Sequence, residues 1–163
     1  MKLSAQEEYG LRCLLRIASS NAGSALTIPE ISAAEGLSVP YVGKLMRILR
    51  QGGFVRSTRG QVGGYTLARP ARLIPVGEVL GLLGGRLVEA DFCNQFSGQS
   101  DVCARSIDCA MRSLWQSVQN AVDGVLTRIT LDDLTRDERD MTAWLATGTK
   151  APGRVQAART PPP

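Results

Sequence analysis

Three of the four cysteines lie on one polar segment of the chain. Cys93, Cys103 and Cys109 are separated by nine and five residues. Thiolates bind soft metal ions and take part in redox exchange, so these positions are the strongest candidates for chemistry. Cys13 stands apart, beside Ile17 in an expected helix, and is interpreted as a small buried hydrophobic residue.

The spacing of the three cysteines admits several arrangements. A disulfide with one leftover thiol is disfavoured in a reducing cytoplasm. A structural zinc site favours four Cys or His ligands, commonly in CxxC pairs, and the chain has neither a CxxC pair nor a histidine. An iron–sulfur cluster accepts three thiolates in an irregular loop, with a fourth ligand from elsewhere. Spacing alone leaves a cluster, a thiol redox switch and a zinc-stabilised protein-interaction module open.

Enzyme chemistry has little support in the remaining residues. The absence of histidine excludes Ser–His and Cys–His catalysis. The chain carries no P-loop and no GxGxxG motif, and the glycines of 60–64 belong to an expected hairpin rather than to a strand–helix junction. We therefore expect a binding protein and not an enzyme.

The elements that position these residues begin with three helices. Ser4 and Glu7 form an expected capping box before an apolar stripe that ends near Asn21 and Gly23. A second capping box, at 27–30, opens a short helix that stops at Gly36. Ser38 is expected to cap a third helix, which ends at 52–53 and buries one stripe: Val42, Leu45, Met46 and Leu49.

Two strand-like segments follow the third helix. Residues 54–57 and 65–68 flank the glycine-rich turn and predict a β-hairpin. Two short helices joined by a tight turn, followed by a hairpin, are typical of a winged helix-turn-helix domain. We expect a mainly α fold with a small β-hairpin, whose winged head occupies residues 1–85.

The second half of the chain predicts a long helix for self-association. A short helix over 75–83 and a polar loop over 91–108 precede it, so we assign 86–110 to a cysteine-containing loop. Apolar residues then recur every three or four positions, more than a small head can cover, and predict packing against a second copy. This stripe comprises Leu114, Val118, Ala121, Val125 and Ile129. Residues 111–147 thus hold the dimerisation helix and a last short helix, capped around Thr135 and running through Trp144. The composition of 148–163 predicts a disordered tail.

Positive charge is concentrated in the expected winged head. Residues 1–80 carry ten Lys and Arg against five Asp and Glu, and no acid lies between Tyr41 and Arg72. A basic run that coincides with a helix-turn-helix pattern indicates double-stranded DNA as a partner. The third helix and the wing offer the candidate contacts, which are Ser38, Tyr41, Lys44, Arg47, Arg56, Ser57 and Arg59.

Nothing in the chain indicates a membrane. No apolar run approaches the roughly 18–20 residues of a membrane span, and the N-terminus lacks the apolar stretch of a signal peptide. We therefore expect a cytoplasmic protein.

Long stretches of this sequence resemble one family of regulators. The opening MKLSAQEEYGLRCLLRIA, the segment from LTIPEISAAEGLSVPYVGKLMRILRQGGF to GGYTLARP, and the loop with three cysteines are similar to the IscR/NsrR/RirA-type winged-helix iron–sulfur transcription regulators. The resemblance covers about residues 1–130. It implies a homodimer that binds an operator and holds a [4Fe-4S] or [2Fe-2S] cluster on Cys93, Cys103 and Cys109.

The resemblance also bears on the fourth ligand. IscR-type members place a histidine three residues after the last cysteine, where this chain has Arg112, which cannot coordinate iron. NsrR-type members use a carboxylate near the N-terminus of the partner subunit, and Glu8 stands at that place. On the helical wheel Glu8 lies about 60° from Leu11, at the edge of the apolar stripe, where we expect a carboxylate to be partly desolvated.

These expectations combine into one functional hypothesis. The chain is a transcription regulator, a repressor, whose operator binding is switched by cluster state in response to redox conditions, nitric oxide or iron supply. The alternative is a metal-free winged-helix regulator that uses a cysteine thiol redox switch.

Overall fold

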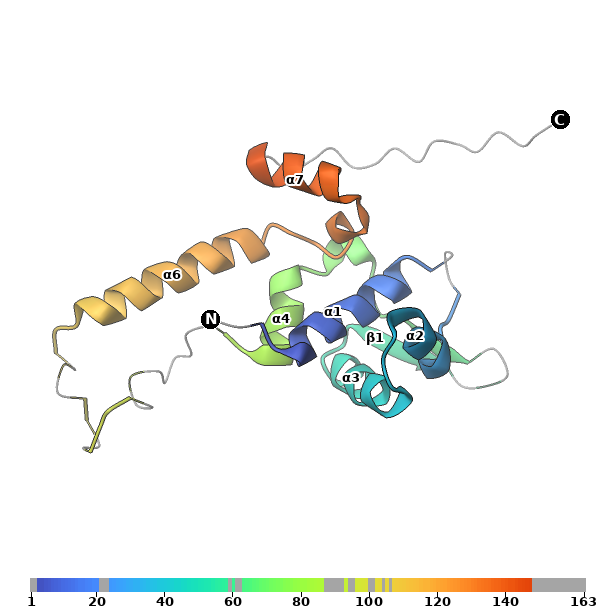
Figure 1. Cartoon of the computed structure of the whole chain (residues 1–163), viewed down its shortest axis with the longest axis horizontal. Coiled ribbons are helices and arrows are strands. Elements are labelled where there is room, and N and C mark those ends of the chain that lie inside the picture. The colour runs from blue at the N-terminus through green and yellow to red at the C-terminus, as the bar shows by residue number, and fades with distance from the viewer. Residues whose placement is uncertain are drawn as a thin grey trace.

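The computed structural model describes residues 3–20, 24–58, 60, 63–86, 93, 96–99, 102–103, 105 and 107–147. A compact head of helices and a two-stranded hairpin carries one long helix that extends away from it (Figure 1). The helices are α1 (Ala5–Ala18), α2 (Ile28–Glu35), α3 (Val39–Gln51), α4 (Val76–Gly84), α6 (Ala110–Leu126) and α7 (Glu138–Thr147). The strands are β1 (Val55–Thr58) and β2 (Gly64–Leu67), and short 3-10 turns cover Ala71–Leu73 and Asp133–Thr135.

Reciprocal caps set the beginnings of α1 and α2. The Ser4 hydroxyl accepts from the Glu7 amide, and the Glu7 carboxylate accepts from the Ser4 amide at 2.7 Å. Thr27 and Glu30 repeat this box, and the hydrogen bonds that Thr27 donates lower the pKa of Glu30. Gly36 ends α2 in the left-handed conformation (φ 68°), which glycine adopts without a Cβ clash. Both expected capping boxes are confirmed.

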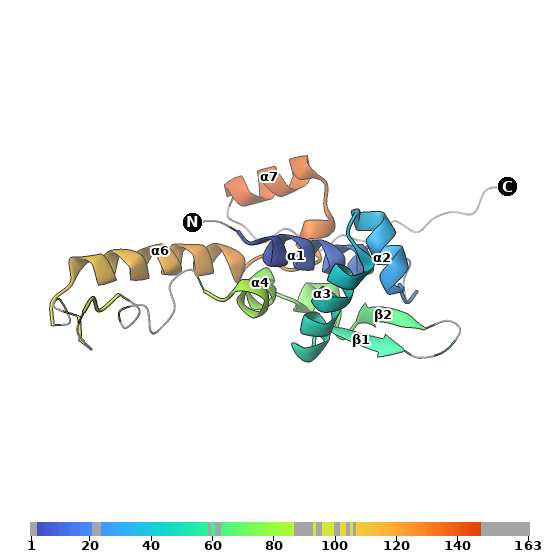
Figure 2. The same ribbon diagram turned by 60° about the horizontal axis from the view of Figure 1, so that its bottom comes forward.

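The core of the head is formed where α1, α3 and α4 meet. Its fully buried side chains include those of Leu14, Leu45 and Leu49. A Cβ added at Gly10 of α1 would lie 2.5 Å from Leu83 of α4, so this glycine permits a close approach of the two helices. The hairpin pairs antiparallel, with Val55 opposite Leu67, and projects from the head beside α3 (Figure 2).

Helix α6 is anchored to the head through its C-terminal half and the residues that follow it. The Val76 amide donates to the Ile129 carbonyl and the Leu131 amide to the Ile74 carbonyl, both at 2.8 Å. Ile129 was expected on the helical stripe, but α6 stops at Leu126 and Ile129 is buried in the head. That expectation was wrong because the chain turns back and pairs with the residues before α4.

Two details of the helix ends differ from the sequence expectation, and a third is not tested. The carboxylate of Asp137, not Thr135, accepts from the backbone at the start of α7, since the Thr135 hydroxyl donates back to the Asp132 carbonyl. Ser38 is the N-cap residue of α3 but makes no side-chain cap hydrogen bond. Helix α1 ends at Ala18, and the expected stop residues Asn21 and Gly23 lie outside the described residues, as does the 148–163 segment.

The expected fold class is confirmed: a mainly α chain with one small hairpin, arranged as three helices followed by a wing. Within the described residues, no helix is long and apolar enough to cross a membrane.

The Thr27 cap yields a stability prediction. We expect Thr27→Ala to lower the free energy of unfolding by about 1 kcal/mol, because the substitution leaves amides at the start of α2 unsatisfied. In the matched Thr135→Ala variant, the free energy of unfolding should fall by only a few tenths of 1 kcal/mol, because Thr135 caps no helix. Urea unfolding followed by circular dichroism measures both, and equal losses would contradict the assignment.

Candidate DNA interface and cysteine loop

The two faces of α3 have opposite characters. Its apolar face is fully buried, whereas Ser38, Lys44 and Arg47 are exposed. Neither Lys44 nor Arg47 takes part in an ion pair within the described residues. The helix therefore presents uncompensated positive charge to solvent, as the sequence predicted.

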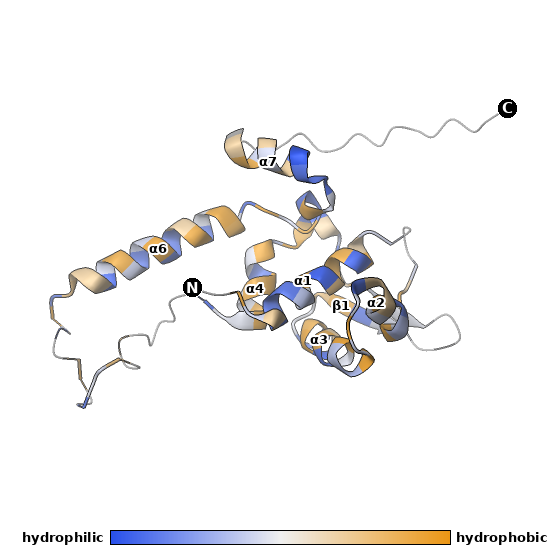
Figure 3. Cartoon of the chain, viewed as in Figure 1, coloured by the Kyte–Doolittle hydropathy of each residue, from blue (hydrophilic) through white to orange (hydrophobic). Residues whose placement is uncertain are grey.

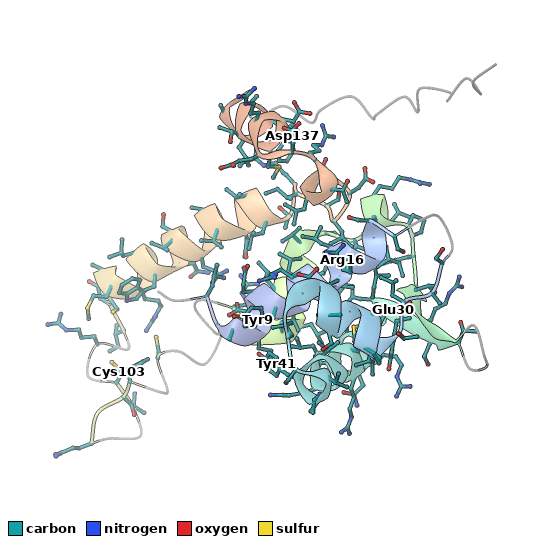
Figure 4. The ribbon with its side chains drawn as sticks, turned by 45° about the vertical axis from the view of Figure 1, so that its right-hand side comes forward. Tyr9, Arg16, Glu30, Tyr41, Cys103 and Asp137 are labelled. Carbon is teal, nitrogen blue, oxygen red and sulfur yellow. The ribbon has the colours of Figure 1, made fainter. Side chains whose placement is uncertain are left out.

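Tyr41 on the first turn of α3 is half-buried against α1. Its ring lies 6.1 Å from that of Tyr9, at an interplanar angle of 85°, which is an edge-to-face contact. The guanidinium of Arg12 lies over the Tyr9 ring at 5.5 Å. Figure 4 shows Tyr9 and Tyr41 side by side at the junction of the two helices.

Glu35, the last residue of α2, forms ion pairs with two arginines of α1. Its carboxylate accepts from Arg12 at 2.9 Å and from Arg16 at 3.0 Å. Arg69 pairs with Glu78 and packs over Phe54. These contacts were not predicted from the sequence, although Arg12 and Arg16 share one face of α1 by their spacing of four residues.

The wing carries further cations. Arg56 and Ser57 on β1 are exposed, and Arg56 Nε donates to the Thr66 hydroxyl at 3.1 Å across the hairpin. This bond directs the Arg56 side chain across the hairpin toward β2. Arg59, the remaining candidate contact in the wing, lies outside the described residues.

The cysteine loop lies at the opposite end of α6 from the anchored end. Cys93, Cys103 and Cys109 are half-buried free thiols, and Cys109 is the N-cap residue of α6. Figures 1 and 2 both show the described residues of this loop near the N-terminal end of α6, away from α1 and α3. Cys13 is fully buried in the head, as expected, and its burial raises the pKa of the thiol to about 11.

Arg112, on the first turn of α6, is an exposed residue whose pKa is affected by the loop cysteines. Its side chain hydrogen-bonds to Cys93, and this bond together with the negative charge of the cysteines raises the pKa of Arg112. Cys103 and Cys109 also interact electrostatically with the guanidinium. From the sequence, Arg112 was noted only as a residue that cannot coordinate iron.

The donor set of the loop suits an iron–sulfur cluster. Cys93, Cys103 and Cys109 are free thiols, and soft thiolates are the ligands that such clusters use. Within the described residues, no three His, Cys, Asp or Glu side chains are close enough together to hold a metal ion. Binding a cluster therefore requires the loop to draw its sulfurs together.

Glu8 is exposed on α1, which corrects the expectation of partial desolvation within its own chain. The neighbouring residues Leu3 and Glu7 line a cavity of about 630 Å³, together with Asp123 and Leu126 of α6. The N-terminus of α1 thus lies beside the C-terminal half of α6, whereas Cys109 is at the N-terminal end of α6.

One face of α6 is apolar and uncovered (Figure 3). Met111, Leu114, Trp115 and Val125 each expose 40% or more of their surface. Large apolar surface on a helix of this length is characteristic of an interaction face.

Comparison with known proteins identifies the family. The Rrf2 model, described as an iron-dependent transcriptional regulator, matches residues 3–137. The chain belongs to the Rrf2 family. Protein rrf2 of Nitratidesulfovibrio vulgaris is 37% identical over 137 residues, covering 84% of this chain and 89% of the relative.

Solved structures agree with this assignment. The global cysteine regulator CymR of B. subtilis superimposes with a TM-score of 0.68 at 28% identity, over 83% of this chain and 96% of CymR. IscR of T. potens gives 0.63 at 29% identity, over 94% of each chain. This member of the Rrf2 family is therefore a transcription regulator and not an enzyme, and the resemblance noted in the sequence is confirmed.

Cys13 should be less reactive toward thiol reagents than the three cysteines of the loop. A thiol with a pKa of about 11 is only about 0.1% thiolate at pH 8, and thiolate is the reactive form. In metal-free protein we expect iodoacetamide to modify Cys93, Cys103 and Cys109, but Cys13 only after denaturation. Mass spectrometry of the peptides measures this difference, and equal modification rates for all four thiols would contradict it.

Proposed function

We propose that this Rrf2-family chain is a homodimeric, DNA-binding repressor whose operator affinity depends on an iron–sulfur cluster held by Cys93, Cys103 and Cys109. The observation that carries the proposal is the presence of three free, half-buried thiols on one segment before α6, away from the exposed cations Lys44 and Arg47 of α3. The cluster, [4Fe-4S] or [2Fe-2S], would supply iron that reacts with oxidants or nitric oxide.

The length and anchoring of α6 favour an antiparallel pair of helices. A helix of 17 residues is about 25 Å long. In a two-fold symmetric pair centred near Val118, the middle of the exposed apolar face, Met111 lies opposite Val125 of the other copy. Each cysteine loop then reaches the C-terminal half of the partner's α6.

This pairing supports Glu8 as the fourth ligand, supplied across the dimer. The N-terminus of α1 lies beside the C-terminal half of its own α6, where the loop of the other copy arrives. Glu8 is exposed there, and its neighbour Glu7 is already used in the cap. Carboxylate oxygen is a harder donor than thiolate and binds iron less strongly, so Glu8 should dissociate first.

Release of Glu8 would free α1, which contacts both helices of the DNA-binding motif. Tyr9 packs on Tyr41 of α3, and Arg12 and Arg16 pair with Glu35 of α2. A shift of α1 would therefore directly displace α3, the helix that we propose reads the major groove and call the recognition helix. The two recognition helices would lose the spacing that matches successive turns of DNA.

For DNA contact, we assign Lys44 and Arg47 of α3 to the major groove. Ser38 and Tyr41 are placed to meet phosphate, and Arg56, Ser57 and Arg59 to contact DNA through the wing. The support is the exposure of Lys44 and Arg47 without ion-pair partners in the described part of the chain.

A metal-free thiol switch is the second candidate. Three free cysteines can form disulfides on oxidation, and the chain is structurally similar to the global cysteine regulator CymR. An absorption band at roughly 320–450 nm in anaerobically purified protein, from thiolate-to-iron charge transfer, distinguishes a cluster from bare thiols. Its absence would overturn the cluster proposal.

The DNA interface is tested by Lys44→Ala. We expect a loss of about 1–3 kcal/mol in operator binding if Lys44 contacts a base, or a salt slope reduced by about one if it contacts phosphate. Arg139→Ala on the exposed face of α7 is the matched control and should change neither quantity. Fluorescence anisotropy at several salt concentrations measures both, and equal losses in the two variants would refute the interface.

Heterodimers test the ligation by Glu8 across the dimer. A Glu8→Ala subunit paired with a Cys103→Ala subunit retains one complete site only if Glu8 acts on its partner's cluster. A wild-type subunit paired with the double variant retains a complete site only if Glu8 acts within its own chain. We expect the wild-type cluster spectrum, at about half intensity, from the first pair and not from the second. The reverse result would place Glu8 in its own chain's site.

A further inference from the structure

One arginine joins the end of the hairpin to α4. Arg69, two residues after the end of β2, donates from Nη2 to the carboxylate of Glu78 on the first turn of α4. The same guanidinium lies over the ring of Phe54, with its central carbon 5.5 Å from the ring centroid. The Arg69 side chain is therefore held by two partners, one immediately before β1 and one on α4.

Phe54 is the residue from which the wing leaves the head. Its amide donates to the Leu49 carbonyl in the last turn of α3 at 3.0 Å, and its carbonyl accepts from the Ala68 amide at 2.9 Å. Only 4% of Phe54 is exposed. Because Phe54 contacts α3 and the chain after β2, a group that holds its ring also helps to fix the angle of the hairpin against the recognition helix.

Arg69 differs from the other cations of the basic run. Lys44 and Arg47 are exposed and form no ion pair in the described part of the chain. The Nε atom of Arg69 is buried, and its Nη2 atom is occupied by Glu78. The planar guanidinium is suited to this combination of an aromatic face and a carboxylate. Arg69 is thus directed toward the protein rather than toward a DNA phosphate.

We propose that Arg69 and Glu78 are positioning residues for the wing: their ion pair, packed on Phe54, sets the angle at which the hairpin meets DNA. This inference rests on the proposed DNA-binding function. An exposed ion pair contributes little to folding stability, so the variants should fold and the effect should appear in DNA binding. The Val76 amide, two residues before Glu78, donates to the Ile129 carbonyl at 2.8 Å. The pair therefore connects the wing to the segment that anchors α6.

Glu78→Gln distinguishes positioning from simple electrostatics by the sign of its effect. Removing an acid from a basic surface would by itself strengthen binding to polyanionic DNA. If the carboxylate positions the wing, the affinity should instead fall by about threefold to fivefold, as expected for the loss of a surface ion pair. Glu138→Gln is the matched control and should bind as the wild type does. Glu138 is an exposed first-turn acid of α7 and forms no ion pair within the described residues.

Arg69→Gln separates a positioning role from a direct DNA contact. A residue that contacts phosphate would reduce the salt dependence of the affinity by about one unit of slope, whereas a positioning residue lowers the affinity and leaves the slope unchanged. The double variant Arg69→Gln/Glu78→Gln should bind no more weakly than Arg69→Gln alone, because both residues act through one contact. Arg72→Gln is the matched control, since Arg72 is exposed in the same basic run and forms no described ion pair. Its affinity should fall less than that of Arg69→Gln.

Fluorescence anisotropy at several salt concentrations measures these quantities, using full-length protein and a DNA duplex enriched from random sequence by the wild type. A wild type that enriches no duplex overturns the DNA-binding function and this inference together. A wild type that binds DNA, with a Glu78→Gln variant of equal or higher affinity, overturns the positioning role alone. Additive losses in the double variant, or a reduced salt slope in Arg69→Gln, also overturn it. Circular dichroism confirms that each variant folds.

Discussion

The backbone pairing of the segment after α6 with the start of α4 fixes the position of α6 relative to the head, and the proposed function depends on that position. Two hydrogen bonds, between Val76 and Ile129 and between Leu131 and Ile74, hold the C-terminal end of α6 on the head, and the burial of Ile129 and Leu131 reinforces them. Because a helix is stiff over 17 residues, its other end and the cysteines must project away from the DNA-binding face. The described residues of the cysteine loop therefore lie away from α1 of the same chain.

In the proposed function, that separation links self-association to sensing. Several apolar side chains of α6 are exposed, and a symmetric pair would cover them and deliver each loop to the other head. Helix α1 would be the receiving element, and it is connected to α2 through Glu35 and to α3 through the Tyr9–Tyr41 contact. In the proposed function, a change at one subunit's loop would reach the DNA-binding helices of the other by direct side-chain packing.

Much of this structure follows from local sequence. The caps at Ser4 and Thr27, the apolar periodicity of α3 and the glycine-rich turn of the hairpin are short-range signals, because each depends on residues within one or two helical turns. The acid-free basic run and the three cysteines were equally visible, and together they indicated a DNA-binding regulator with reactive thiols. What sequence could not decide were the contacts between distant segments. Ile129 fits a helical stripe by spacing but lies in the head, because pairing with Val76 satisfies its backbone and buries its side chain. Likewise the exposure of Glu8 and the contact of Arg112 with Cys93 depend on where whole helices are anchored, which no local pattern encodes.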